Sequence, residues 1–162
     1  MKNNLEKIVV NAGIGRLAGS ATNFPEKILP ELISEFALIT GQKPGLRPAK
    51  KSIAGFKIRQ GNVIGLKSTL RGRRMVQFLD KLVKVVLPRL RDFRGIDLKN
   101  IDGSGNLSVG LREQMVFPEI SQEKSKVDFG LEVTIVPRVK NREKAIEFYR
   151  AAGLPLRKST KS

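Results

Sequence analysis

The glycine-rich sequence GIGRLA at residues 13–18 is the first stretch whose spacing could support chemistry. Its GxGxxA pattern follows a short apolar run, as it does in dinucleotide-binding turns. In such a turn a helix must open at once, so that its backbone amides face a pyrophosphate. Residues 19–25 are a poor start for a helix, and no second parallel strand is expected at the right distance. We therefore predict a glycine-rich turn, and a nucleotide-dependent enzyme is only an alternative.

Side chains suited to catalysis or metal binding are scarce. The chain has no Cys and no His, which excludes disulfide bonds, thiolate chemistry and Ser/His/Asp or Cys/His catalysis. Zinc sites also depend largely on these two residue types. Asp80, Asp92 and Asp97 could form acid–base pairs, but basic neighbours keep carboxylates ionised, and salt bridges to arginine are expected instead. The sequence thus predicts no enzyme, no catalytic residue, no metal site and no cofactor.

Positive charge is concentrated in the central third of the chain. The formal net charge of the 162 residues is +16. Residues 41–94 carry fifteen basic and two acidic side chains, a net +13, whereas residues 1–40 sum to 0 and residues 95–162 to +3. A protein whose charge serves solubility alone has both signs interspersed. One strongly basic segment therefore indicates a surface for a polyanion such as nucleic acid.

Two stretches of this segment have the residue types that RNA binding needs. The sequence LRGRR at residues 70–74 places three arginines at an expected helix start, where they oppose the helix dipole. Phosphate contact is therefore favoured there over a merely solvated helix end. Residues 50–61 mix Lys and Arg with Ile53, Phe56 and Ile58, which share no face at a strand or helix period, so a functional loop is favoured over an ordinary strand. Cations of this loop would meet phosphates, and Phe56 could stack on a base or a ribose.

Hydrophobic periodicity predicts the elements that position these residues. Strands are expected at residues 7–11, 64–71, 107–113 and 127–136, and helices at 30–40, 73–87 and 142–152, with a separate turn at 24–29. Such strands favour an α+β fold: an antiparallel sheet with helices packed on one face, its other face open, and a long basic loop. The length predicts a single domain over residues 1–156, followed by a basic tail at 157–162. Because no long apolar run is present, we expect a cytoplasmic protein that neither crosses a membrane nor is exported.

Seven stretches of the chain share one resemblance: KIVVN (7–11), TGQKP (40–44), AKKSIAGFKIRQG (49–61), TLRG (69–72), PRLRDFRG (88–95), FPEI (117–120) and GLP (153–155). Together they resemble the bacterial form of the ribosomal protein L5 family, the large-subunit family that binds 5S rRNA. They appear in the family's order and cover about residues 7–156. The chain departs from the family pattern in a shorter segment before the first strand, at Arg16 and Leu17, and in residues 136–139.

The resemblance implies a structural protein of the large ribosomal subunit, whose sheet grips 5S rRNA in the central protuberance and whose loop contacts P-site tRNA. Further implied partners are 23S rRNA and, across a subunit bridge, the small-subunit ribosomal protein uS13. The residues implied to bind 5S rRNA are Lys7, Asn11, Gln42, Lys67, Thr69, Arg71 and Arg73. Those implied for the tRNA-contacting loop are Lys50, Lys51, Ser52, Phe56, Lys57, Arg59 and Gln60. A free-standing RNA chaperone or translation regulator with the same basic surface remains an alternative.

Overall fold

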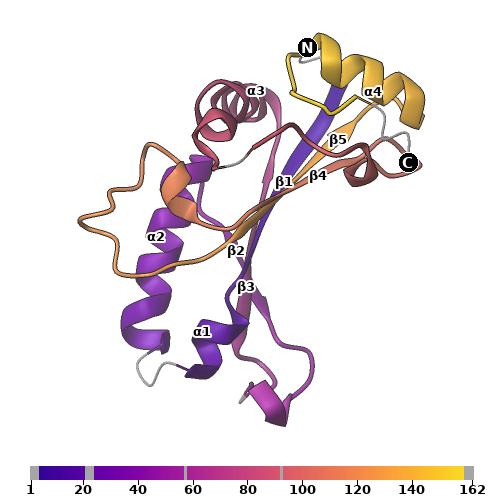
Figure 1. The fold of residues 1–162 in the computed structure, drawn as a ribbon. Helices are drawn as coiled ribbons and strands as arrows, with labels where there is room; N and C mark the ends of the chain where they lie inside the picture. Colours follow the sequence, from indigo (N-terminus) through magenta and orange to yellow (C-terminus); the bar gives the residue numbers. More distant parts are fainter. Residues whose placement is uncertain (1–3, 21–23, 57, 92, 159–162) are drawn as a thin grey trace. The chain divides into compact units, whose positions relative to one another are not determined.

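The computed structural model of the chain describes residues 4–20, 24–56, 58–91 and 93–158 (Figure 1). The strands in these ranges are β1 (Leu5–Gly13), β2 (Gly45–Pro48), β3 (Val63–Leu70), β4 (Leu107–Leu111) and β5 (Leu131–Pro137). The α-helices are α1 (Gly15–Ser20), α2 (Leu29–Thr40), α3 (Gly72–Lys81) and α4 (Arg142–Ala151). Shorter helical turns are η2 (Phe24–Ile28), η3 (Ala54–Phe56), η4 (Leu82–Val86), η5 (Leu87–Arg89), η6 (Leu98–Asn100) and η7 (Gln114–Val116).

The five strands form one antiparallel sheet in the order β2-β3-β1-β5-β4. Burial alternates along them: Ile8, Val10 and Ala12 of β1 are buried, whereas Lys7 and Asn11 are only half-buried. The same alternation in β3, β4 and β5 gives each strand one side in the core and one side that reaches solvent. The expected α+β fold with an antiparallel sheet is confirmed, and β1, β3 and β4 lie where short strands were expected.

The chain groups into two compact units. Unit 1 comprises residues 1–9, 69–110 and 132–162, and unit 2 comprises residues 10–68 and 111–131. A compact unit is not by itself a domain, so the expected single domain over residues 1–156 stays a prediction. Of the expected basic tail, Arg157 and Lys158 are described, whereas residues 159–162 lie outside the described residues.

Unit 2 contains the most regular of the expected helices, α2. Pro30 lies in its first turn, where the missing N–H costs nothing, and Gly41 ends the helix with a φ of +77°. Its apolar stripe buries Leu32 and Phe36 among others. The helix expected at residues 30–40 is therefore confirmed, and η2 forms the separate turn expected before it.

The glycine-rich turn expected at residues 13–18 is wrong, because the short helix α1 begins at Gly15. The Ile14 N–H donates to the Ile64 C=O at 2.9 Å, which ties the end of β1 to β3 just before the chain turns. Gly15 lies so close to β3 that a Cβ there would be 3.6 Å from the Ile64 Cβ. Packing against a strand thus stabilises a helix that the local sequence disfavours. Because α1 follows a strand of an antiparallel sheet, the βαβ unit of a dinucleotide site is not formed there.

The strand expected at residues 127–136 begins later, since β5 starts at Leu131. Val127 and Phe129 are buried as expected, but their backbone groups bond to Gln114 instead of a neighbouring strand, and the Phe129 C=O accepts from the Gln114 backbone N–H at 3.1 Å. The Phe129 N–H donates to the Gln114 Oε1 at 3.1 Å, and the Gln114 Nε2 donates to the Val127 C=O. Alternation therefore predicted the right core residues, whereas the buried Gln114 decides the backbone pairing.

The carboxyl group of Glu35 on α2 lies beside this glutamine. Its Oε2 is buried and has no hydrogen-bond partner among the described residues. Burial raises the pKa of Glu35 above its ordinary value, and the nearby Glu31 and Asp128 carboxylates raise it further, whereas hydrogen bonds to Ser125 and Gln114 oppose the shift. The folded state thus favours the protonated form. The contribution of Glu35 to stability consequently falls as pH rises from the unfolded-state pKa through the folded-state one.

Unit 1 contains α3 and α4, of which α3 is shorter than expected. α3 stops at Lys81, and the chain continues as η4 and η5 instead of one continuous helix. Pro88 lies in η5 and ends the helical segment, as expected. α4 is capped by Asn141, whose side chain accepts from the Lys144 N–H at 3.0 Å, and Gly153 follows its end with a φ of +89°.

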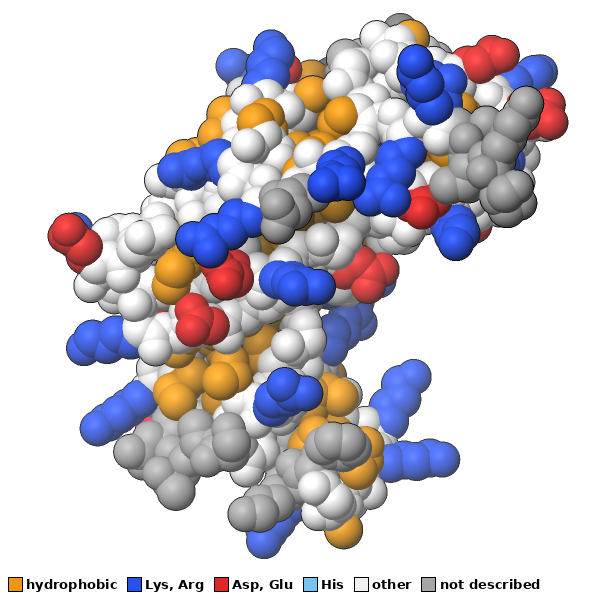
Figure 2. Space-filling view, viewed as in Figure 1, with side chains coloured by type: hydrophobic (Ala, Val, Ile, Leu, Met, Phe, Trp, Pro, Cys, Tyr) orange, Lys and Arg blue, Asp and Glu red, His pale blue; other side chains and the backbone are white. Residues whose placement is uncertain are grey.

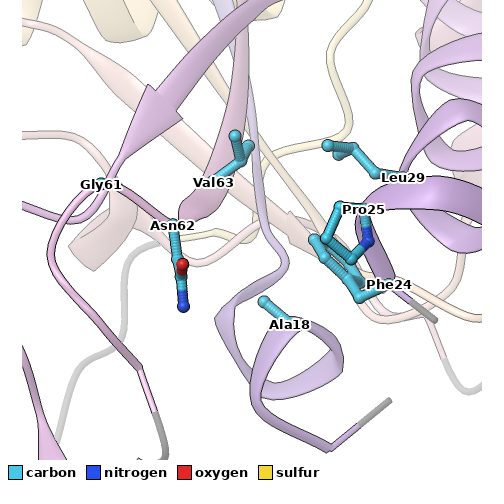
Figure 3. Close-up of a pocket in the computed structure, with 7 residues that line it drawn as sticks. All are labelled: Ala18, Phe24, Pro25, Leu29, Gly61, Asn62 and Val63. Atoms are coloured by element: carbon cyan, nitrogen blue, oxygen red, sulfur yellow. The ribbon is translucent and has the colours of Figure 1, made fainter. Parts of the chain in front are cut away.

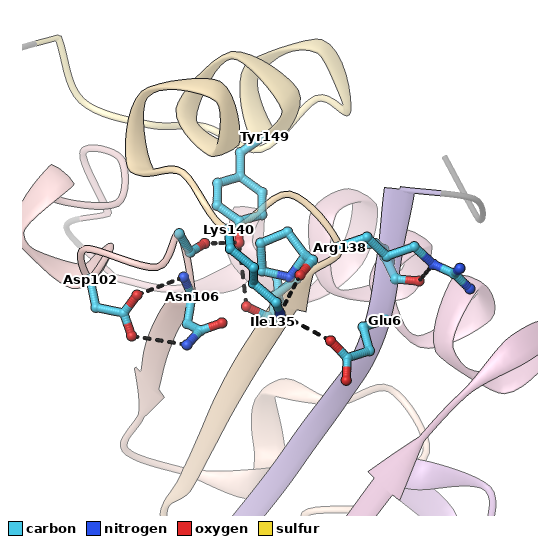
Figure 4. Close-up of polar contacts among 10 residues, drawn as sticks. Glu6, Asp102, Asn106, Ile135, Arg138, Lys140 and Tyr149 are labelled. Atoms are coloured by element: carbon cyan, nitrogen blue, oxygen red, sulfur yellow. Dashed lines mark hydrogen bonds and ion pairs between the residues drawn. The ribbon is translucent and has the colours of Figure 1, made fainter.

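A buried hydrogen bond joins α4 to the turn before β4 (Figure 4). The Tyr149 hydroxyl donates to the Gly105 C=O, and the Ile135 C=O lies 3.3 Å from the same hydroxyl. Within the turn, Asp102 accepts from the Asn106 N–H at 2.9 Å and from the Asn106 side-chain amide at 3.0 Å. The backbone bond from Asn106 is the main cause that holds the pKa of Asp102 below its ordinary value. Hydrogen bonds within the turn therefore hold the Gly105 carbonyl in place as the acceptor for Tyr149 of α4.

Candidate nucleic-acid interface

The residues predicted to bind 5S rRNA lie in both units, and Lys and Arg side chains are scattered over the face shown in Figure 2. In unit 2, Asn11 of β1 and Lys67 of β3 are half-buried, on the side of their strands opposite the core residues. Gln42 follows the C-cap of α2, where the buried Thr40 hydroxyl lies 3.0 Å from the Gln42 C=O. These three predicted residues thus occupy positions that reach solvent.

Arg47 of the edge strand β2 adds a cation that the sequence analysis missed. It pairs with Gly65 of β3, and directly paired residues of antiparallel strands point to the same side. Gly65 lies two residues before Lys67 and so shares its side of β3. A Cβ on Gly65 would lie 3.3 Å from the Arg47 Cβ, so the missing side chain leaves room for the arginine. All four residues of β2 are exposed, so the strand shows no alternation of buried and exposed residues that could predict it. The position of Arg47 within the basic segment 41–94 was the one available sign that it belongs to the RNA surface.

In unit 1, Lys7 of β1 and Arg71 lie near the same acidic residue, Glu6. The Lys140 Nζ pairs with the Glu6 Oε2 at 3.0 Å, with both side chains about half exposed (Figure 4). The hydrogen bond from Lys140, followed by its charge, holds the pKa of Glu6 below its ordinary value, and the charges of Lys7 and Arg71 add to this effect. Glu6 therefore stays ionised, and Lys140 is the cation that bonds to it. Lys7 and Arg71 keep their charges available to a polyanion.

Thr69 and Arg73 complete the predicted set in unit 1. Thr69 is half-buried on the outward side of β3, and Arg73 is exposed in the first turn of α3. That turn contains no acidic residue and holds Arg74 as well, so side-chain charge adds to the positive end of the helix dipole. Such an arrangement costs stability locally and suits an anion, which the backbone N–H groups and the guanidinium groups can bind together.

The long basic loop expected at residues 50–61 is part of a narrow hairpin, residues 49–62, between β2 and β3. The backbones of Ile53 and Ile58 exchange two hydrogen bonds, of 2.8 and 3.1 Å, and further bonds close the base. Ile58 is buried, whereas Ile53 is 44% exposed near the tip. The long loop is therefore not confirmed, although these two apolar residues differ in burial as their spacing suggested.

Most residues predicted to contact tRNA lie on the surface of this hairpin. The Ser52 Oγ accepts from the Gln60 N–H at 2.9 Å, so these two residues also hold the hairpin closed. Lys57 and the side chain of Phe56 lie outside the described residues, and their expected contacts stay predictions. The exposed members of the set are Lys50, Lys51, Ser52, Arg59 and Gln60.

Comparison with known proteins decides the family. Residues 2–59 match the family described as ribosomal protein L5, and residues 63–156 match the one described as the ribosomal L5P family C-terminus. The chain belongs to the ribosomal protein L5 family. It is similar to the large ribosomal subunit protein uL5 of Carboxydothermus hydrogenoformans, with 51% identity over 151 residues, which cover 93% of this chain and 82% of the relative. The uL5 proteins of Geotalea daltonii and Halothermothrix orenii are 50% and 48% identical to it, over 94% and 93% of this chain and 83% and 82% of the relatives.

Membership of the L5 family identifies a structural protein of the large ribosomal subunit, not an enzyme. The carboxylates considered as acid–base pairs serve as ion-pair partners: Asp80 pairs with Lys84 at 2.9 Å, and Asp97 lies 3.8 Å from Arg157. Asp92 lies outside the described residues. In the described part of the chain, no cluster of three or more His, Cys, Asp or Glu side chains could hold a metal ion. No helix in that part is long and apolar enough to cross a membrane.

A small, mainly apolar pocket lies at the base of the hairpin in this L5-family chain (Figure 3). Its volume is about 250 Å³. Asn62 is the lining residue with a polar side chain, and no lining residue is charged, so the pocket is unsuited to a phosphate group. The lining residues are Ala18, Phe24, Pro25, Leu29, Gly61, Asn62 and Val63.

Proposed function

We propose that this L5-family protein binds 5S rRNA, helps attach it to 23S rRNA in the central protuberance, and contacts P-site tRNA through the hairpin at residues 49–62. The observation that carries 5S rRNA binding is the chemistry of the outward sides of β1 and β3. Lys7, Asn11, Lys67 and Thr69 alternate there with buried residues. Asn and Thr side chains both donate and accept hydrogen bonds, which suits 2′-hydroxyls and base edges, while the lysines suit phosphates.

A free-standing RNA chaperone with the same surface is the competing function. Membership of a ribosomal family supports a stable place in the large subunit, where the proposed neighbour across a subunit bridge is uS13. A chaperone held by transient phosphate contacts would be released by moderate salt. Co-sedimentation with large subunits in about 0.3 M salt therefore separates the two functions, because an assembled ribosomal protein stays bound.

Binding to 5S rRNA should weaken steeply as salt is added. About five phosphates neutralised by the basic surface would give a slope of log affinity on log salt of about −3.5 to −4.5. The variant Lys67→Gln with Arg71→Gln should reduce the magnitude of this slope by about 1.5, as measured by filter binding. The matched variant Lys27→Gln with Lys124→Gln removes the same charge from exposed positions outside the proposed surface and should keep the original slope. A flat salt response of the unmodified chain would refute phosphate contact.

The substitution Thr69→Val should weaken 5S rRNA binding by about 1 kcal/mol, roughly fivefold. Val suits a strand and removes only the hydroxyl group that we place against RNA, so the melting temperature should change little. Thr134→Val makes the same change at a half-buried position of β5 and should leave affinity unchanged. If melting temperature falls for Thr69→Val while affinity holds, Thr69 is a core residue and the outward side has been misassigned.

Neutralising the exposed hairpin cations should impair tRNA contact selectively. The triple variant Lys50→Gln, Lys51→Gln and Arg59→Gln should lower P-site tRNA affinity about tenfold and keep 5S rRNA affinity within about twofold. Substitution is preferable to deletion, because a deletion would also remove the buried Ile58. tRNA binding to ribosomes reconstituted with the variant measures the first effect, and filter binding measures the second. Equal loss of both affinities would mean that the hairpin belongs to the 5S rRNA surface.

A further inference from the structure

Part of the connection between β4 and β5 lies against α2 in unit 2 (Figure 1). We name residues 121–129 the α2-bound segment. The Lys126 N–H of this segment donates to the Glu31 Oε1 of α2 at 3.1 Å. Val127 and Phe129 are buried, whereas residues 121–124, 126 and 128 are exposed. A few hydrogen bonds to side chains thus hold the segment in place, and such segments open at a lower free energy than the strands of a sheet.

A second carboxyl group of α2, that of Glu35, is buried where the segment meets the helix. Glu35 lies one turn after Glu31, so both side chains are on the same side of α2. Its side chain is only 8% exposed, and its Oε2 is buried with no hydrogen-bond partner among the described residues. Ionisation leaves this oxygen charged without a donor, which costs free energy. Protonation removes the charge and makes one oxygen a donor.

The charges that act on Glu35 from the two elements are negative. Glu31 belongs to α2 and Asp128 to the α2-bound segment, and both carboxylates disfavour ionisation of Glu35. Lys124 and Lys126 are exposed in the same segment, but none of the ion pairs found among the described residues includes Glu35. Ionised Glu35 is therefore repelled by carboxylates on both sides of the contact, and no ion pair offsets this repulsion.

We propose that Glu35 is a pH-sensitive switch, which holds the α2-bound segment closed on α2 when its carboxyl group is protonated and lets the segment open when the group ionises. Burial is the main cause that raises the pKa of Glu35 in the closed state. The stabilisation of the closed segment is therefore complete below the open-state pKa and is lost as pH rises through the closed-state one. Opening exposes Val127 and Phe129, which are buried in the closed segment. The switch uses none of the proposed RNA contacts, so the two proposals fail independently.

Amide hydrogen exchange of the full chain tests the switch, with each rate divided by its intrinsic rate at the same pH. Protection of the Lys126 and Phe129 amides should fall about tenfold between about pH 5 and about pH 7.5, because an unpartnered buried carboxylate costs roughly that factor. Glu35→Gln keeps the shape and a donor but cannot ionise, so protection of the two amides should be the same at both pH values. The Val10 amide of β1 should change little in either protein and reports on global unfolding.

A second pair of variants leaves Glu35 in place, so the test does not depend on the folding of Glu35→Gln. Asp128→Asn removes a negative charge that acts on Glu35 and eases its ionisation, so the fall in protection should be about twofold smaller. The matched variant Glu123→Gln removes the same charge from another exposed position of the α2-bound segment and should keep the full fall.

Four results would overturn the switch. Equal protection at both pH values in the original chain means that Glu35 does not control closure. A fall as large in Glu35→Gln means that another group titrates, and low protection in that variant at both pH values means that the carboxylate itself holds the segment. Equal effects of Asp128→Asn and Glu123→Gln mean that the net charge of the segment, and not the charge beside Glu35, sets its opening.

Discussion

Replacing Gln114 with Glu should lower the free energy of unfolding by about 3–5 kcal/mol at neutral pH. The Gln114 side chain is fully buried, accepts from the Phe129 N–H and donates to the Val127 C=O. A carboxylate accepts but cannot donate, so the Val127 carbonyl would lose the Gln114 donor, keep only the bond from the Ser125 hydroxyl at 3.1 Å, and face a buried negative charge. Gln114→Glu should therefore lower the free energy of unfolding several times more than an ordinary surface substitution does, and equilibrium urea unfolding can measure the difference.

The destabilisation by Gln114→Glu should shrink as pH falls. Glu35 lies beside the substituted position and already has a pKa raised by burial, so the surroundings disfavour another ionised carboxyl. The introduced carboxyl would have a folded-state pKa above its unfolded-state value. The loss is then absent well below the unfolded-state pKa and grows as pH rises through the folded-state one. Gln122→Glu makes the same change at an exposed position and should cost less than about 0.5 kcal/mol, whereas a pH-independent loss at Gln114 would contradict this mechanism.

Gln114 also shows which part of the fold the sequence could not predict, namely the backbone pairing of residues 127–130. Alternation in residues 127–136 identified Val127 and Phe129 as core residues, because burial follows side-chain direction along an extended chain. Whether an extended segment joins a sheet depends on which groups take its backbone hydrogen bonds. Here Gln114 takes those bonds, and no local pattern marks a buried glutamine for that role. The helix α1 was missed for a related reason, since packing against β3 overrides poor local propensity.

The candidate RNA surface also contains residues that the sequence could place and residues that it could not. The outward positions of Lys7, Asn11, Lys67 and Thr69 follow from alternation within single strands, so the sequence could predict them. Arg47 could not be placed, because its side is set by its register with β3. The parallel bridge between Ile96 and Leu156 is equally non-local, because periodicity within either of the two distant stretches carries no record of it.

Replacing Gly105 with Ala should destabilise unit 1 by about 2–4 kcal/mol. The φ of Gly105 is +88°, which already strains a residue with a side chain, and a Cβ there would lie 2.7 Å from the Ala145 Cβ. Ala145 is fully buried on α4, so relief of this clash requires α4 or the turn to move. Such a movement would also disturb the hydrogen bond that the Tyr149 hydroxyl donates to the Gly105 C=O. Strain, overlap and a lost buried hydrogen bond thus act together, and urea unfolding should show their combined effect.

Gly103 in the same turn provides the matched control. A Cβ at Gly103 would meet no atom within 4 Å, and its φ lies outside the left-handed region. Gly103→Ala should therefore change the free energy of unfolding by less than about 0.5 kcal/mol, although it adds the same methyl group and removes the same backbone freedom from the unfolded chain. The difference in free energy of unfolding between the two variants therefore measures how closely α4 packs against Gly105. If Gly105→Ala unfolds at the same urea concentration as Gly103→Ala, α4 does not rest on Gly105 as described, and the burial of the Tyr149 hydroxyl would need another explanation.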